Sequence, residues 1–235
     1  MPLGVDEAGK GPALGSMFAA AVYCGAPDRL PDGIADSKDL APERREKLAA
    51  IIRDDDRVRV GVAEITPARI DDPETDMNSL AVTAHAAAID DALAGIDLEA
   101  SGADSGDSIA GLCDACDTDA DRFARRVADA CTVPAVTDGS LEAPLEIAAR
   151  HGADEESRLV GAASIVAKVE RDAHVAALAA EYGPVGSGYP GDPTTRAFLE
   201  DYVDDHGELP PFARASWSTC EDVLAAARQT SLEGF

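Results

Sequence analysis

The sequence contains few aromatic residues and no long apolar run. Aromatics make up 4% of the 235 residues although 46% are hydrophobic, so the core must consist mainly of Ala, Val, Leu and Ile. No segment approaches the roughly 20 apolar residues that cross a bilayer, and no basic segment followed by an apolar one opens the chain. We therefore expect a cytoplasmic protein without a membrane span, with one main domain and a small appendage.

Cysteine is also scarce. The five cysteines are odd in number and scattered, which does not fit a disulfide framework, so we expect reduced thiols. Cys113 and Cys116 form a Cys-x-x-Cys unit, typical of redox chemistry or of half a zinc site, but no second pair with suitable spacing accompanies it. We interpret both as small core residues. The chain also lacks a Walker phosphate loop and a Gly-x-Gly-x-x-Gly fingerprint.

Positive charge is in deficit, with 20 basic against 45 acidic residues and a net charge of -25. Proteins that bind phosphates usually carry a basic surface, so the composition alone argues against a nucleic-acid partner. However, the acidic excess is spread along the whole chain, and only four of the basic residues are lysines. We interpret it as adaptation to a salt-rich cytoplasm, where screening makes such repulsion tolerable. A non-catalytic acidic protein that mimics DNA is the alternative.

Apolar spacing and turn residues predict an alternation of strands and helices, as parallel βα units require. We expect a hairpin over 3–24 with its turn at 9–12 and its second strand at 16–22, then strands at 57–65, 109–113 and 133–136. We expect helices at 42–53, 78–94, 121–131, 155–182, 194–205 and 219–228, and another that begins at Pro67 with Thr66 as its N-cap. Residues 99–108 are expected to form a loop without a function.

The stretch from Gly4 to Pro12 contains the first candidate site. Asp6 and Glu7 end an otherwise apolar strand, and the glycine turn after them allows their side chains to converge. Buried together, they would need compensation, which a divalent cation usually supplies. A solvated strand end explains the pair equally well at this point. Lys10 lies between two glycines, where backbone amides can approach a phosphate or sugar without a Cβ in the way.

The motifs together resemble the ribonuclease HII family, especially its archaeal branch, over essentially the whole chain. The resemblance rests on ordered blocks at 4–12, at 36–40 (DSKDL), at 114–119 leading into Arg122-Phe123, at 151–154 (HGAD) and at 162–172. It implies an α/β, ribonuclease H-like fold with a central mixed five-stranded sheet flanked by helices. We expect a catalytic domain over 1–183, a helical C-terminal portion over 184–228 packed on it, and a tail over 229–235.

The resemblance also implies the catalytic site. Its four carboxylates, which would bind two divalent cations, Mg²⁺ or Mn²⁺, are Asp6, Glu7, Asp114 and Asp154. One cation would activate water and the other would stabilise the leaving 3′ oxygen. Asp104, Asp107 and Asp117 compete with Asp114, but only Asp114 has the family's spacing to Arg122-Phe123, and the other three are interpreted as solvated. Asp172 competes with Asp154, which is favoured near a helix N-terminus.

The implied substrates are the RNA strand of an RNA–DNA hybrid and duplex DNA with embedded ribonucleotides. Cleavage 5′ of the ribonucleotide would leave a 5′ phosphate and a 3′ hydroxyl, with roles in ribonucleotide excision repair and primer removal. The Gly9-Lys10-Gly11 turn would read the 2′ hydroxyl. Tyr189 would pack on the next sugar, with a buried structural tyrosine as the alternative. Further expected phosphate contacts are Ser37, Lys38, Ser164, Lys168 and Arg171, although the last two could form ion pairs along a helix.

Some residues depart from the family pattern or compete with it. Lys10 stands where arginine is commoner, so a bidentate fork is lost. Gly152 stands where many archaeal relatives carry lysine. His85 and His174 fall inside expected helices, and we interpret them as structural rather than catalytic. The sister family, ribonuclease HIII, is disfavoured because it usually has an N-terminal extension and a different pattern after the paired acids.

The last seven residues fit the pattern Gln-x-x-Leu-x-x-Phe. They resemble a sliding-clamp (PCNA) interaction box, whose anchors would be Gln229, Leu232 and Phe235. The second aromatic of such a box is absent. A tail that binds nothing is the alternative, and we expect a monomer.

Overall fold

The structure is a computed structural model that describes residues 2–34, 40–95, 108–132 and 145–233. Contacts divide the chain into two units. The first consists of residues 1–8, 18–64 and 78–169, and the second of residues 9–17, 65–77 and 170–235. The expected domain boundary between 183 and 184 stays a prediction.

A mixed sheet of five strands forms the centre of the first unit, in the order β3-β2-β1-β4-β5. The strands are β1 (Leu3–Ala8), β2 (Met17–Cys24), β3 (Val58–Ile65), β4 (Ile109–Asp114) and β5 (Leu145–Arg150). β1 pairs antiparallel with β2 and parallel with β4, which pairs parallel with β5. The sheet class and the opening hairpin are thus confirmed. β5 was not predicted, and the expected strand at 133–136 lies outside the described residues.

The helices follow the expected order with two corrections. They are α1 (Pro42–Asp54), α2 (Pro67–Ile70), α3 (Met77–Leu93), α4 (Ala120–Ala130), α5 (Ala153–Glu156), α6 (Arg158–Tyr182), α7 (Pro193–His206) and α8 (Ser218–Glu233). The long helix expected at 155–182 is interrupted at Ser157, whose backbone is extended. α8 continues past Arg228 to Glu233, so most of the expected tail is helical. Thr66 is the N-cap of α2 and Pro67 begins the helix, as predicted, although the Thr66 side chain makes no capping hydrogen bond.

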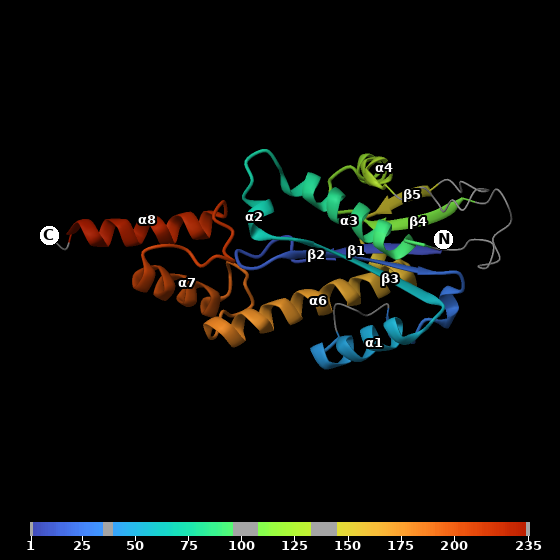
Figure 1. The fold of residues 1–235 in the computed structure, drawn as a ribbon, viewed down its shortest axis with the longest axis horizontal. Helices are drawn as coiled ribbons and strands as arrows, with labels where there is room; N and C mark the ends of the chain where they lie inside the picture. Colours follow the sequence, from blue (N-terminus) through green and yellow to red (C-terminus); the bar gives the residue numbers. More distant parts are fainter. Residues whose placement is uncertain (1, 35–39, 96–107, 133–144, 234–235) are drawn as a thin grey trace. The chain divides into compact units, whose positions relative to one another are not determined.

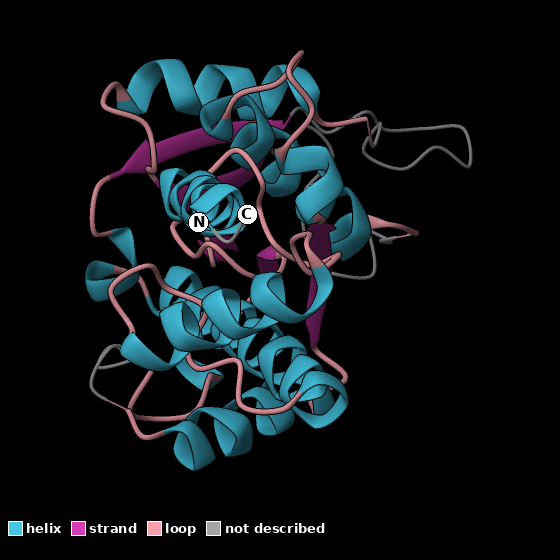
Figure 2. Cartoon of the chain, turned by 90° about the vertical axis from the view of Figure 1, so that its left-hand side faces the viewer, coloured by secondary structure: helices cyan, strands magenta, loops and turns pink. Residues whose placement is uncertain are grey.

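Helices cover both faces of the sheet (Figure 1), and the view turned by 90° shows strands between helices (Figure 2). On one face, β2, α1 and the apolar first half of α6 bury a cluster that includes Val22, Leu48 and Ile165. Two glycines in the strands allow helices to approach the strand backbone closely. A Cβ at Gly4 would lie 2.3 Å from the carbonyl carbon of Leu159 in α6, and one at Gly61 would lie 2.2 Å from the carbonyl oxygen of Ala88 in α3. The helices therefore pack directly against strand backbone.

The second unit joins the turn after β1 to the C-terminal helices. Its core includes Leu14, Val185, Leu199 and Phe212. The amide of Ala13 donates to the carbonyl of Gly188 at 2.8 Å, and the amide of Gly15 donates to the carbonyl of Phe212 at the same distance. The turn at 9–15 is thus bound to two segments that lie about 180 to 200 residues later.

Two expectations concern the whole chain. None of the described helices is long and apolar enough to cross a membrane. All five cysteines are free thiols, as expected. Burial raises the pKa of the Cys113 thiol well above its usual value, which favours the unreactive protonated form.

Candidate active site

Strand register brings two of the expected carboxylates together in the first unit. β1 and β4 are parallel neighbours in which Val5 pairs with Cys113, so Asp6 and Asp114 each lie one residue further along. Asp114 is the last residue of β4, and its Oδ1 accepts a hydrogen bond from the amide of Ala153 at 2.7 Å. That contact places the first turn of α5, which contains Asp154, beside the carboxyl end of β4.

Two of these acids, Asp6 and Asp154, are shielded from water, whereas Asp114 is half-buried. Asp6 is 5% exposed and Asp154 is 2% exposed. Burial and then the charge of Glu7 raise the pKa of Asp6 well above its usual value. A hydrogen bond from Ser164 and the charge of Lys168 offset part of this rise, and the charge of Asp114 adds to it. A buried group of like charges of this kind is compensated best by a divalent cation with oxygen ligands, so the donor set fits the implied metals.

One oxygen of each of three acids is held by a protein nitrogen. The amide of Glu7 donates to Asp6 Oδ1 at 2.8 Å, and the amide of Ala153 holds Asp114 Oδ1 as described above. The imidazole Nε2 of His85 lies 2.9 Å from Glu7 Oε2. His85 was interpreted from the sequence as structural rather than catalytic, and its contact with Glu7 was not predicted. The available signal was a lone imidazole on the buried side of an alanine-rich helix.

The competing aspartates are engaged elsewhere or are not described. Asp117 was expected to be solvated, and this was wrong: it is 4% exposed, and Arg122 Nη2 donates to its Oδ1 at 2.6 Å. That hydrogen bond is the main reason why the pKa of Asp117 falls to about 2. Asp172 belongs to the second unit and pairs with Arg171 at 3.3 Å. Asp104 and Asp107 lie outside the described residues.

Two of the expected substrate contacts lie beside Asp6. Ser164 and Lys168 are one turn apart on α6, and Lys168 Nζ donates to Ser164 Oγ. Because both side chains also act on Asp6, α6 presents a hydroxyl and a positive charge next to the acids. Ser37 and Lys38 lie outside the described residues.

In the second unit, Arg214 and Trp217 fix the Gly9-Lys10-Gly11 turn. Arg214 is fully buried, and its guanidinium donates to the carbonyls of Gly9 at 2.6 Å, Lys10 at 2.9 Å and Gly15 at 2.9 Å. Burial lowers its pKa to about 10. Trp217 Nε1 donates to the carbonyl of Gly11 at 3.2 Å. Neither role was predicted from the sequence.

The direction of these carbonyls sets the direction of the amides in the turn. The described peptide bonds are all trans, so each N–H points opposite to the C=O of its own peptide unit. Since the carbonyls of Gly9 and Lys10 face Arg214, the amides of Lys10 and Gly11 point away from it. The turn therefore presents two consecutive donors on its other side, a geometry suited to a hydroxyl or phosphate oxygen.

Tyr189 lies against the same turn. A Cβ at Gly11 would lie 3.6 Å from Tyr189 Cε1, and the guanidinium carbon of Arg171 lies 5.2 Å from the centre of the tyrosine ring. Tyr189 is 43% exposed, so the alternative of a buried structural tyrosine is wrong. An exposed ring beside a fixed cation suits stacking on a sugar or base.

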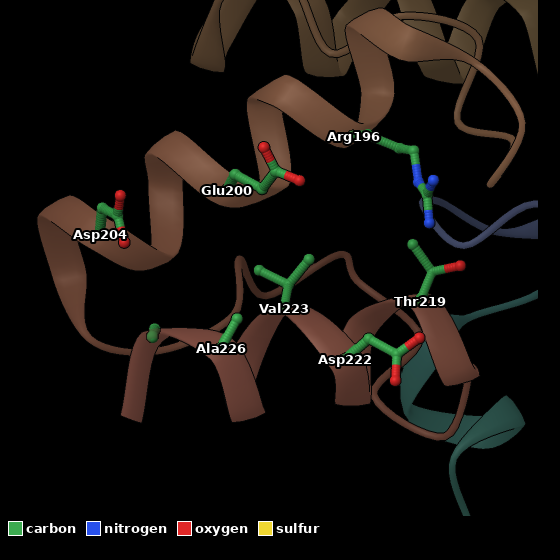
Figure 3. Close-up of a pocket in the computed structure, with 8 residues that line it drawn as sticks. Arg196, Glu200, Asp204, Thr219, Asp222, Val223 and Ala226 are labelled. Carbon is green, nitrogen blue, oxygen red and sulfur yellow. The ribbon is translucent and has the colours of Figure 1, made fainter. Parts of the chain in front are cut away.

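A groove of about 400 Å³ between α7 and α8 is a different kind of surface (Figure 3). Arg196 lies at one end, and Glu200, Asp204 and Asp222 contribute carboxylates along it. No residue expected to contact the substrate is among its lining residues. Its charge would repel phosphates. Further along α8 lies Gln229 of the expected clamp box, whereas the side chain of Leu232 and the whole of Phe235 are not described.

The chain is similar to known proteins over the sequence of both units. The ribonuclease HII family model matches residues 3–220. The ribonuclease HII of Haloarcula marismortui is 58% identical over all of both chains, and that of Natronomonas pharaonis is 52% identical over 99% of this chain and 98% of its own.

Two solved structures share the fold over nearly the full length. The ribonuclease H2 of Pyrococcus horikoshii has a TM-score of 0.79 and 33% identity, and the alignment covers 97% of this chain and 98% of the other. The RNase HII chain in a PCNA:RNase HII complex from Archaeoglobus fulgidus has a TM-score of 0.76 and 32% identity over all of both chains.

Proposed function

The chain belongs to the ribonuclease HII family of metal-dependent endoribonucleases, which cleave RNA in RNA–DNA hybrids, and we propose that Asp6, Glu7, Asp114 and Asp154 form its catalytic metal site. The observation that carries this proposal is the group of carboxylates at the carboxyl ends of β1 and β4, in which Asp6 is buried and Glu7 and Asp114 are half-buried. The raised pKa of Asp6 is the expected property of a carboxylate arranged to bind a cation.

Each residue has a definite task in this proposal. The four carboxylates bind and orient two divalent cations, Mg²⁺ or Mn²⁺, beside the scissile phosphate. When bound, these cations supply activation of water and stabilisation of the leaving 3′ oxygen. Lys168 and Ser164 offer a charge and a hydroxyl to phosphate oxygens next to Asp6. The products carry a 5′ phosphate and a 3′ hydroxyl.

The second unit is proposed to select ribonucleotides. The amides of Lys10 and Gly11 contact the 2′ hydroxyl, and Tyr189 packs on the following sugar. Arg171, which stacks on Tyr189 and donates to the carbonyl of Ser187, keeps that ring in place. Cleavage 5′ of a single ribonucleotide in duplex DNA would serve ribonucleotide excision repair and primer removal.

The test is cleavage of an end-labelled DNA duplex that contains one ribonucleotide, with Mg²⁺ or Mn²⁺ at molar KCl. We expect a single cut 5′ of the ribonucleotide and no cut in an all-DNA duplex. Asp114→Asn should reduce the rate by at least about 100-fold, since one ligand loses its charge. Asp117→Asn is the matched control, because Asp117 pairs with Arg122 and should affect stability more than the rate. A wild-type protein without metal-dependent cleavage would favour the non-catalytic alternative.

We also propose that Gln229, Leu232 and Phe235 dock on a sliding clamp. The support is the terminal motif together with the likeness to the A. fulgidus protein, whose structure is a complex with PCNA. Deletion of residues 229–235 should abolish clamp binding in a pull-down with the purified clamp while leaving cleavage of short duplexes unchanged. Equal clamp binding with and without the segment would contradict the proposal.

A further inference from the structure

His85 is a buried histidine that contacts one of the proposed metal ligands. It lies in α3 with no exposed surface, and its Nε2 is 2.9 Å from Glu7 Oε2. Glu7 must be ionised to bind a cation, and an ionised carboxylate only accepts hydrogen bonds, so in that state the imidazole donates from Nε2. The contact thus fixes both the proton position on the ring and the direction of one Glu7 oxygen.

The rest of the ring environment supports this tautomer. His85 Nδ1 is buried and has no hydrogen-bond partner among the described residues. A proton on Nδ1 would leave a buried N–H group unpaired, which is rarer and costlier than an unpaired acceptor. The ring of Phe123 packs edge-on against the imidazole, with centroids 5.0 Å apart and planes at 83°. Because Phe123 is itself fully buried, the imidazole has little freedom to turn.

We propose that His85 is a positioning residue for Glu7, which presets this carboxylate for cation binding. The inference rests on the proposed metal site. Glu7 then matches Asp6 and Asp114, each of which also has one oxygen held by a protein nitrogen. A ligand with one oxygen fixed loses less freedom on binding a cation and directs its second oxygen to it.

A different role for His85 would be as a metal ligand itself. Ligand atoms of Glu7, His85 and Cys116 lie within 4.8 Å of one another, and this set would suit Zn²⁺. However, two ligands on a tetrahedral Zn²⁺ with bonds of about 2.0–2.1 Å lie about 3.3 Å apart. The separation of 2.9 Å between His85 and Glu7 is that of a hydrogen bond, so the arrangement favours positioning over shared coordination.

The experiment compares His85→Leu, which fills the space without a donor, with His85→Gln, which carries an N–H near the place of Nε2. Mn²⁺ binding is measured by calorimetry on the full chain without substrate, and the Mg²⁺ concentration for half-maximal cleavage is measured in parallel. We expect His85→Leu to weaken metal binding by roughly 10- to 100-fold and His85→Gln to recover most of that loss. Val82→Ala, a buried change on the same helix, should lower thermal stability but leave Mn²⁺ affinity unchanged.

Two results would overturn the positioning role. If a folded His85→Leu protein bound Mn²⁺ with wild-type affinity, Glu7 would not require His85 to be positioned for cation binding. An additional equivalent of Zn²⁺, lost in Cys116→Ser, would make His85 a ligand instead. Absence of Mn²⁺ binding in the wild type would instead refute the metal site on which the inference rests.

Discussion

Asp6 is a carboxylate that the fold keeps almost entirely away from water. Such a group is costly in its ionised form unless a cation neutralises it. We predict that Mn²⁺ raises the melting temperature of the wild type at pH 7.5. At 100 times the dissociation constant, the gain is about 2.7 kcal/mol, or roughly 5–10 °C for a chain of this size. Asp6→Asn should melt at a higher temperature than the metal-free wild type and should lose most of the Mn²⁺ shift in a thermal unfolding assay.

The same residue sets a pH dependence in the absence of metal. The pKa of Asp6 is raised in the folded chain because of burial and the charge of Glu7, whereas the unfolded chain keeps the ordinary value of 3.8. A raised carboxyl pKa contributes stability that is complete below the ordinary value and is lost as pH rises through the folded value. We predict that the difference in melting temperature between Asp6→Asn and the metal-free wild type grows from pH 4 upward. A constant difference across that range would contradict the raised pKa.

At the level of helices and strands, strong periodic patterns were predictable and context-dependent ones were not. β5 was missed because Leu-Glu-Ile-Ala-Ala-Arg contains a single β-branched residue and no aromatic one, and because it is only partly buried. Its strand conformation comes from pairing all six residues with β4, which is a tertiary effect. The break at Ser157 was missed because every residue around it is compatible with a helix. Ser157 Oγ accepts from the amide of Val160 at 3.4 Å and so begins a new helix.

In the candidate site as well, residues in local motifs were predictable, whereas residues whose role depends on distant contacts were not. Asp6, Glu7, Asp114 and Asp154 could be named because each lies in a local motif. The burial of Asp117 was not predicted because it depends on Arg122, and the contact of His85 with Glu7 was not predicted because the two residues lie 78 positions apart. Arg214, about 200 residues after the turn that it holds, has no local signal for that role. Long-range contacts of this kind are invisible to periodicity.

The conformation of the Gly9-Lys10-Gly11 turn depends on the hydrogen bonds that Arg214 and Trp217 donate to its carbonyls. Trp217→Phe keeps an aromatic ring beside Arg214 but removes the donor to the carbonyl of Gly11, which should cost about 1 kcal/mol of stability. Arg214→Lys keeps the charge, but an ammonium cannot match the fork that reaches three carbonyls, so we expect a loss of about 2–4 kcal/mol.

The turn contacts substrate rather than metal in the proposed function, so Trp217→Phe should raise KM for a single-ribonucleotide duplex more than it lowers kcat. Urea unfolding and steady-state kinetics measure the two effects. A lower kcat with an unchanged KM would place the turn in the chemical step instead. Tyr182→Phe, a change beside Phe212 in the same unit that leaves the Arg214 and Trp217 donors in place, serves as the control.

For the whole molecule, the dominant physical quantity is the net charge of -25. At 0.1 M salt, charges repel over a Debye length of about 10 Å, which falls to about 3 Å at 1 M. The relatives from Haloarcula and Natronomonas are more than 50% identical to this chain. This similarity supports the proposal of salt adaptation. Screening would also let bound cations and local groups such as Lys168 outweigh the global charge when the substrate approaches.

We therefore predict that raising KCl from 0.1 to 2 M stabilises the fold by a few kcal/mol, or roughly 5–10 °C in melting temperature. The acidic groove between α7 and α8 offers a local test, since Glu200, Asp204 and Asp222 are exposed and line the same surface. Replacing all three by their amides should reduce the KCl dependence because less repulsion is left to screen, whereas Arg196→Gln in the same groove should increase it. If the melting temperature rose equally with KCl in the wild type and both variants, specific ion binding, and not screening of this charge, would stabilise the chain.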